Sequence, residues 1–234
     1  MGCENRIVYD FVDVISGNAR LSQALVKDKQ LENLFTLPAS QTRDKDALTD
    51  AGVAEVIQEL SKQFDYIVCD SPAGIERGAQ LAMYHADEAI IVTNPEISSV
   101  RDSDRIIGIL QSRTKKVEEG LGTVREHLVI NRYNAERAER GEMMDINSIS
   151  NDILKVPLLG VIPESNSVLE ASNQGVPVVL DKESKAGQTY DDMVARFLGE
   201  ERPYRHIEVK KKSFFTCAQS TLLSATKINS IAAL

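Results

Sequence analysis

The chain has 234 residues, a formal net charge of −8 and no tryptophan. This acidic balance argues against broad nucleic-acid binding, which needs a basic face. The odd number of cysteines, three in all and without C-x-x-C spacing, argues against a disulfide framework or a zinc site. The cysteine usage makes a cytoplasmic, reducing compartment the default. No apolar run approaches the roughly 20 residues that span a bilayer.

Short apolar runs alternate with amphipathic segments along the chain. Three of these runs are continuous rather than alternating, which is typical of strands buried on both faces of a parallel sheet: "YIVC" at 66–69, "AIIVT" at 89–93 and "LVI" at 128–130. Strands are predicted over residues 34–37, 66–69, 89–93, 127–131, 158–162 and 177–180.

Helices are predicted between these strands. Apolar residues at helical spacing indicate a helix within 44–63 and another over 190–198, with Gly199 as its C-terminal cap. Ser99 and Asp102 read as the capping box of a helix that begins near Ser99. The alternation predicts an α/β fold with a doubly wound, mostly parallel sheet. We expect one domain over 1–200 and a tail over 201–234.

Polar residues follow several predicted strands, and ligands of doubly wound sheets bind at the carboxyl ends of strands. Asp70 is placed to hold Mg²⁺, directly or through water, and Pro72, Ala73 and Gly74 form a small-residue turn that a γ-phosphate can approach. Taken alone, Asp70 is better read as a helix cap or turn aspartate. The other strand ends favour the site, and they carry Asn131, Arg132, Pro163 and Glu164.

A phosphate-binding P-loop needs a Gly-Lys pair. None of the 13 glycines is followed by lysine. We therefore expect this stretch to lack the N-terminal P-loop strand and its lysines, and so to contain no catalytic residue of its own.

The blocks "YIVCDSPAGIE", "DEAIIVTNPEISSVRDSDRIIGIL", "GVIPES" and "VLEASNQG" resemble the deviant-Walker P-loop ATPases of the MinD/ParA family, in particular its division-site branch. The resemblance covers about residues 1–215. It implies an ATP- and Mg²⁺-dependent homodimer, peripheral on the cytoplasmic face of the inner membrane. Such proteins recruit MinC, which blocks FtsZ polymerisation, and are released by MinE.

The resemblance also assigns roles to residues. Asp70 resembles the Walker B aspartate, and Pro72, Ala73 and Gly74 resemble the switch segment after it. The adenine is expected against Asn131, Arg132, Pro163 and Glu164. The surface shared by MinC and MinE is expected at Ser98, Asp102 and Asp104, although their spacing alone favours a merely solvated helix face.

The chain also departs from the family. Family members begin with the P-loop strand, and the basic membrane-targeting segment, here 201–215, stops matching over 216–234. Membrane contact is expected from Lys210, Lys211, Lys212, Phe214 and Phe215. The absence of the P-loop strand and the unmatched segment over 216–234 together predict a fragment or a broken gene model.

Three functions stay open at this point. The first is a division-site ATPase subunit, here incomplete, and the second is a non-enzymatic fragment that binds MinC or MinE. The third is a ParA-like partition ATPase, against which the charge of −8 and the absence of a basic stripe both count. An upstream reading frame with a strand and a Gly-Lys loop would favour the first over the second.

Overall fold

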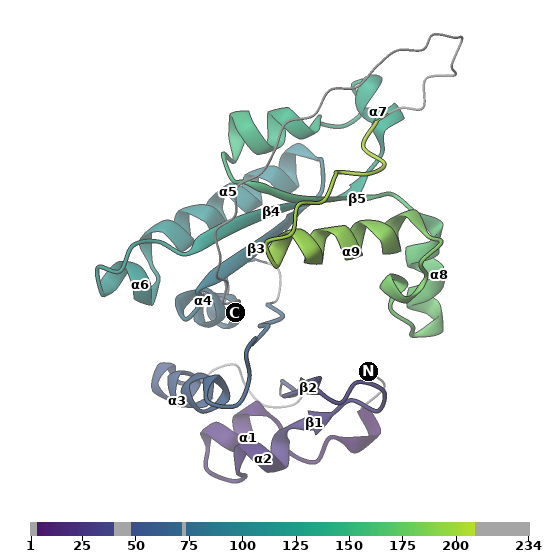
Figure 1. The fold of residues 1–234 in the computed structure, drawn as a ribbon. Helices are drawn as coiled ribbons and strands as arrows, with labels where there is room; N and C mark the ends of the chain where they lie inside the picture. The colour runs from purple at the N-terminus through teal and green to yellow at the C-terminus, as the bar shows by residue number, and fades with distance from the viewer. Residues whose placement is uncertain (1–3, 40–47, 72–73, 209–234) are drawn as a thin grey trace. The chain divides into compact units, whose positions relative to one another are not determined.

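The computed structural model describes residues 4–39, 48–71 and 74–208 (Figure 1). Contacts within the chain divide these residues into two compact units. The first contains the described residues up to Asp87 together with Ile109–Val124. The second contains Glu88–Gly108 and the described residues from Arg125 onward. Each unit is considered by itself.

The first unit is mainly helical. Its two strands pair antiparallel, with Val26 opposite Thr36. Its elements are η1 (Glu4–Arg6), α1 (Phe11–Ile15), α2 (Leu21–Ala24), β1 (Val26–Lys27), β2 (Phe35–Thr36), α3 (Asp50–Ser61), α4 (Arg77–Tyr84) and α6 (Lys115–Glu118). The strand predicted at 34–37 is therefore real but short, and it lies in an antiparallel pair rather than in the parallel sheet.

Helix α3 confirms the helix predicted within 44–63, although residues 44–47 lie outside the described ones. The Thr49 hydroxyl caps its first turn by accepting a hydrogen bond from the Gly52 N–H at 3.2 Å. Val53, Val56 and Leu60 are buried at the predicted helical spacing.

The strand predicted at 66–69 is wrong, because the structure assigns no strand to these residues. Tyr66 is exposed and Val68 is 82% exposed. A strand needs a neighbour to satisfy its backbone N–H and C=O groups, and no described strand pairs with this run. The apolar composition of "YIVC" indicates a strand, but this run has no strand to pair with among the residues that the structure describes.

The second unit contains a parallel sheet in the order β3-β4-β5. β3 pairs with β4 in one regular register, from Glu88 opposite Arg125 to Thr93 opposite Ile130. The elements of the unit are β3 (Glu88–Thr93), α5 (Ile97–Ser112, whose last turn belongs to the first unit), β4 (Arg125–Tyr133), α7 (Ala135–Glu139), η3 (Ser148–Ile153), β5 (Leu158–Pro163), α8 (Asn166–Gln174), η4 (Val178–Leu180) and α9 (Lys185–Phe197). Three predicted strands and the doubly wound α/β class are thus confirmed.

Helices cover both faces of this sheet, with α9 along one face and α5 along the other (Figure 1). The core under α9 joins Val129, Leu159 and Ile162 to Ala186. Gly160 allows the close approach of this helix, because a Cβ at that position would lie only 3.0 Å from the Met193 Cγ.

Strand β3 differs from its neighbours in burial. Ile91 is 5% exposed, whereas Ile90 and Val92 are 46% and 59% exposed. The prediction that this run is buried on both faces is therefore wrong for one face. The reason is positional: β3 ends the described sheet, and the α9 core takes its strand residues from β4 and β5 alone.

Two smaller predictions are also wrong. Helix α5 begins at Ile97, so Ser99 lies inside its first turn and caps nothing; its carbonyl accepts a hydrogen bond from the Ser103 hydroxyl at 3.0 Å. Residues 177–180 form no strand but contain the 3₁₀ turn η4. A four-residue apolar run can bury its side chains in a helical turn as well as in a strand, and here the turn packs Val178 against the α9 core.

The predicted end of the last helix is confirmed, because Gly199 follows the cap residue of α9 with φ +90°. The chain then packs back on its own unit. The Tyr204 hydroxyl donates to the Leu158 carbonyl at 2.6 Å, and the Arg205 Nε lies 2.8 Å from the buried Asp192 carboxylate. None of the helices described in the structure is long and apolar enough to cross a membrane.

Candidate functional site

The carboxyl ends of β4 and β5 lie side by side. Tyr133 stands opposite Pro163, and the Glu164 N–H donates to the Tyr133 carbonyl at 2.9 Å. Between Ile130 and Tyr133 the register shifts, so that β4 contains one residue more than β5 over this stretch. The two residues in the shifted segment are Asn131 and Arg132.

Arg132 has an unusual backbone conformation. Its φ of +56° lies in the left-handed region, which costs a residue with a Cβ about 1–2 kcal/mol. Strained residues of this kind cluster at functional sites, and register irregularities occur next to active sites, where they redirect side chains. The Asn131 side chain is half-buried and that of Arg132 is exposed. The strain and the shift together favour a ligand site here.

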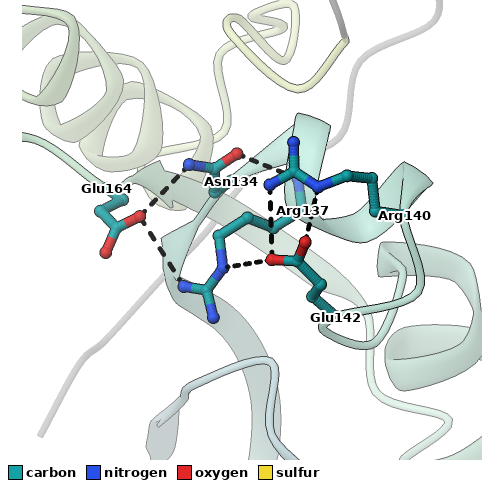
Figure 2. Close-up of polar contacts among 5 residues, drawn as sticks. All are labelled: Asn134, Arg137, Arg140, Glu142 and Glu164. Atoms are coloured by element: carbon teal, nitrogen blue, oxygen red, sulfur yellow. Dashed lines mark hydrogen bonds and ion pairs between the residues drawn. The ribbon is translucent and has the colours of Figure 1, made fainter.

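A polar network joins the two strand ends (Figure 2). Asn134 caps α7, since its side-chain oxygen accepts from the Arg137 N–H at 3.2 Å, and its Nδ2 donates to the Glu164 Oε2 at 3.3 Å. The Arg137 Nη1 lies 3.9 Å from the same Glu164 oxygen. On its other side, the Arg137 Nε donates to the Glu142 Oε2 at 3.3 Å.

Arg140 completes the network. Its Nε donates to the Glu142 Oε1 at 2.6 Å, and this hydrogen bond lowers the pKa of Glu142 and raises the pKa of Arg140. Both groups are therefore charged at neutral pH. Next to the network, burial raises the pKa of the Tyr133 hydroxyl, which stays neutral.

Asp70 belongs to the first unit, whereas the strand-end residues belong to the second. The Asp70 side chain is exposed and makes no hydrogen bond or ion pair with other residues that the structure describes. Gly74 has φ +98°, a turn conformation that suits glycine. Pro72 and Ala73 lie outside the described residues.

The residues present fit Mg²⁺ in one respect. Mg²⁺ in nucleotide sites is held by one or two carboxylates, with water and phosphate as its other ligands, and Asp70 offers one free carboxylate. Among the described residues no group of three or more His, Cys, Asp or Glu side chains forms a metal cage.

The predicted partner surface lies on α5. Ser98, Asp102 and Asp104 are all exposed. Asp102 pairs with Arg105 at 3.4 Å, and both side chains are largely in solvent, so the pair contributes little to stability. All three side chains are open to solvent, although Asp102 and Asp104, which are two residues apart, lie on different sides of the helix.

A family model described as the "CobQ/CobB/MinD/ParA nucleotide binding domain" matches residues 8–178. The septum site-determining protein MinD of Neisseria meningitidis is 62% identical over 218 residues, which is 92% of this chain and 80% of that protein. MinD of Escherichia coli is 60% identical over 92% of this chain and 79% of its own length. This chain belongs to the MinD/ParA family.

Solved structures agree with this assignment. MinD of Aquifex aeolicus superposes with a TM-score of 0.75 at 39% identity, over 88% of this chain and 80% of that one. MinD of Pyrococcus horikoshii, solved with Mg-ADP, gives a TM-score of 0.65 at 32% identity, over 81% and 73%. The P-loop NTPase fold, the septum-site relatives and the ATPase family expected from the sequence are thus confirmed.

Most of the polar network was not predicted from the sequence. Glu164 was predicted, but its partners Asn134 and Arg137 were not, and neither were Arg140 and Glu142, which extend the network. Two signals were present. Asn134 is a good N-cap residue ahead of "AERAE", and charges of opposite sign recur in "ERAERGE" at spacings that allow pairing.

Proposed function

We propose that this protein selects the division site as a nucleotide-dependent MinD ATPase. It would bind Mg-ATP, dimerise on the cytoplasmic face of the inner membrane, recruit MinC against FtsZ and be released by MinE. The single observation that carries the proposal is the identity of 60% and more to MinD proteins over 92% of the chain.

The geometry supports the base side of a nucleotide site. Asn131, Arg132, Pro163 and Glu164 meet at the carboxyl ends of two parallel strands, where this fold class binds ligands. Asp70 and Gly74 belong to the first unit, and their roles beside Mg²⁺ and phosphate rest on the sequence resemblance alone.

The residues do not fit the phosphates themselves. Phosphates are held by backbone N–H groups and a lysine, and no Gly-Lys pair occurs in the sequence. This favours a second candidate function for the stretch as printed: a fragment that binds MinC or MinE without hydrolysing ATP. A partition role like that of ParA is disfavoured by the net charge of −8. A ParA family ATPase from Chlorobium tepidum, which is 20% identical, shares the fold alone.

Binding to MinC tests the proposal. One of the solved neighbours is a MinC:MinD complex from Aquifex aeolicus, with 39% identity and a TM-score of 0.75. We expect the purified chain to bind MinC, and a double change Asp102→Ala and Asp104→Ala to weaken binding about tenfold, which corresponds to 1.4 kcal/mol. Biolayer interferometry measures the affinity.

The matched control is Glu170→Ala, which removes an exposed acid from α8. Its affinity for MinC should equal that of the wild type. Equal losses in both variants would point to net charge rather than to the α5 surface, and a wild-type chain that ignores MinC would contradict the partner assignment.

Membrane binding gives a second prediction. The residues expected to contact the membrane lie outside the described ones: Lys210, Lys211, Lys212, Phe214 and Phe215. Each cation near anionic lipid contributes about 1 kcal/mol, but stable anchoring also needs a second signal such as dimerisation. We expect weak, salt-sensitive binding to anionic liposomes that ATP does not change. Sedimentation at two salt concentrations measures it; strong ATP-dependent pelleting would show that this stretch binds nucleotide and dimerises.

A further inference from the structure

We infer that residues 202–206, here called the latch segment, hold Arg205 on a buried acid of α9 and release it to an anionic lipid surface. The inference rests on the proposed function, because it assumes that the basic run after residue 208 binds lipid. It adds a regulatory contact formed within the second unit, by residues that precede that run.

Arg196 of α9 holds the first part of the latch segment. Its Nε donates to the Arg202 carbonyl at 3.2 Å, and its guanidinium carbon lies 4.3 Å from the centre of the Tyr204 ring. A cation over an aromatic face is attracted to it. The Tyr204 hydroxyl also donates to the Leu158 carbonyl of β5, so this side chain is held by two elements.

Asp192 of α9 holds the Arg205 side chain. Its own side chain is 5% exposed, whereas that of Arg205 is 42% exposed. The Arg205 Nε lies 2.8 Å from the Asp192 Oδ2, but this oxygen accepts no hydrogen bond from the residues that the structure describes. Charged pairs are strongest when they are also hydrogen-bonded. The contact is therefore an ion pair that can be exchanged for another.

Arg196 is a second possible partner for Asp192. The two residues are four apart on α9, with the acid nearer the N-terminus, which is the favourable order for a pair on one helix face. The Arg196 Nη1 and Nη2 are buried and have no hydrogen-bond partner in the described part of the chain. Burial lowers the pKa of Arg196, and the Asp192 carboxylate acts in the opposite direction, so the two charges already interact.

The latch therefore has two states. In the closed state, Asp192 pairs with Arg205, while Arg196 contacts Arg202 and Tyr204. In the open state, Asp192 pairs with Arg196, and the latch segment leaves α9. Removing one partner of a buried ion pair is normally costly, because the other charge is left uncompensated. Exchange of Arg205 for Arg196 avoids this cost.

An anionic surface favours the open state. Residues 202–212 contain one acid and five lysines or arginines, and Arg205 precedes Lys210 by only five positions. A ligand shifts an equilibrium only when it binds one state more tightly than the other. Lipid phosphates gain Arg205 only when the latch opens, and each additional cation near such a surface strengthens binding about fivefold.

Asp192→Asn tests the inference, because it neutralises the acid that holds Arg205. The first measurement is the initial rate of tryptic cleavage after Arg205, followed by mass spectrometry. The second is sedimentation with vesicles that contain phosphatidylglycerol. We expect cleavage to be about tenfold faster than in the wild type, and affinity for these vesicles to be about fivefold higher. Vesicles of phosphatidylcholine alone should show no such increase.

Asp191→Asn is the matched control. It removes the same charge from the neighbouring residue, which pairs with Lys182 and not with the latch segment. Its cleavage rate and vesicle affinity should stay close to those of the wild type. Circular dichroism confirms that each variant is folded. If Asp192→Asn does not fold, Tyr204→Ala should give the same two increases, because it removes the contacts with Arg196 and Leu158.

The possible outcomes separate the inference from the proposed function. An increase in only one of the two measurements, or in neither, would overturn the inference and leave the proposed function standing. Equal increases in Asp191→Asn would reveal an effect of net charge and would also overturn the inference. If neither the wild type nor the open variant binds anionic vesicles, the inference and the membrane part of the proposed function are both wrong.

Discussion

A chain of the 234 printed residues is expected to release no phosphate from Mg-ATP beyond background. Hydrolysis of a nucleoside triphosphate requires positive charge and N–H donors around the β- and γ-phosphates, placed where negative charge develops. Loss of one such donor costs about 10²–10³ in rate. Since the sequence contains no Gly-Lys pair, we expect this stretch to lack the N–H donors and the lysine that hold the phosphates.

Asp70 cannot replace the cradle. Its carboxylate is exposed and anionic, and without a metal ion it repels phosphate. A phosphate-release assay on the purified chain measures the turnover, and Asp70→Ala is the control for contaminating ATPase, because an exposed side chain without described partners can be removed without cost to the fold. Turnover clearly above this control would contradict the prediction and would mean that other residues bind the phosphates.

The second large effect is expected in self-association. β3 ends the described sheet with the run Ala89–Thr93, which has no charge, proline or bulge to protect it, and natural edge strands usually have one of these. Ile90 and Val92 are largely exposed, and so are Tyr66 and Val68 of the first unit. We expect the chain to form oligomers at tens of micromolar.

Val92→Lys should shift these oligomers toward monomer. Burying a valine contributes about 1.5–3 kcal/mol, so its loss weakens association by about tenfold or more. The contrasting variant is Ile91→Lys on the other face of the same strand. It buries an unpaired charge at a cost of about 3–5 kcal/mol, a large share of a total stability of about 5–15 kcal/mol, and should unfold the chain.

Analytical ultracentrifugation and thermal melting separate the two variants. Lower association for Val92→Lys with an unchanged melt, and an unfolded Ile91→Lys, would confirm which face of β3 is open. A wild-type chain that stays monomeric at these concentrations and melts in one sharp transition would contradict the prediction, because the exposed apolar residues would then cause no association.

The sequence predicts the parallel core of this protein well. Residues 89–93, 127–131 and 158–162 appear as β3, β4 and β5 within a few residues, because long apolar runs between helices have few other solutions. The same reasoning fails at 66–69 and 177–180. An apolar run becomes a strand only where another strand can pair with it, and the composition of the run does not show whether such a strand exists.

The candidate site is predictable in its parts but not in its arrangement. Asn131, Arg132 and Glu164 follow from the rule that ligands bind at strand ends. The left-handed conformation of Arg132 does not, since arginine usually avoids it. The contact between Arg137 and Glu164 joins residues far apart in sequence, and only the register of β4 and β5 brings them together.

The register of β4 and β5 also fixes the length of both strands. Between Leu128 and Val129 the partner strand contains one additional residue, and between Ile130 and Tyr133 β4 contains one. The two insertions cancel, so that pairing at Tyr133 and Pro163 stays in step with pairing at Leu128 and Leu158. Deleting a residue from either strand would leave the other insertion uncompensated, and every side chain beyond it would turn to the opposite face. Over these residues the protein should therefore tolerate substitutions better than insertions or deletions. A relative that lacks one of the two additional residues would have to lack the other as well, if its strands are to pair in the same register.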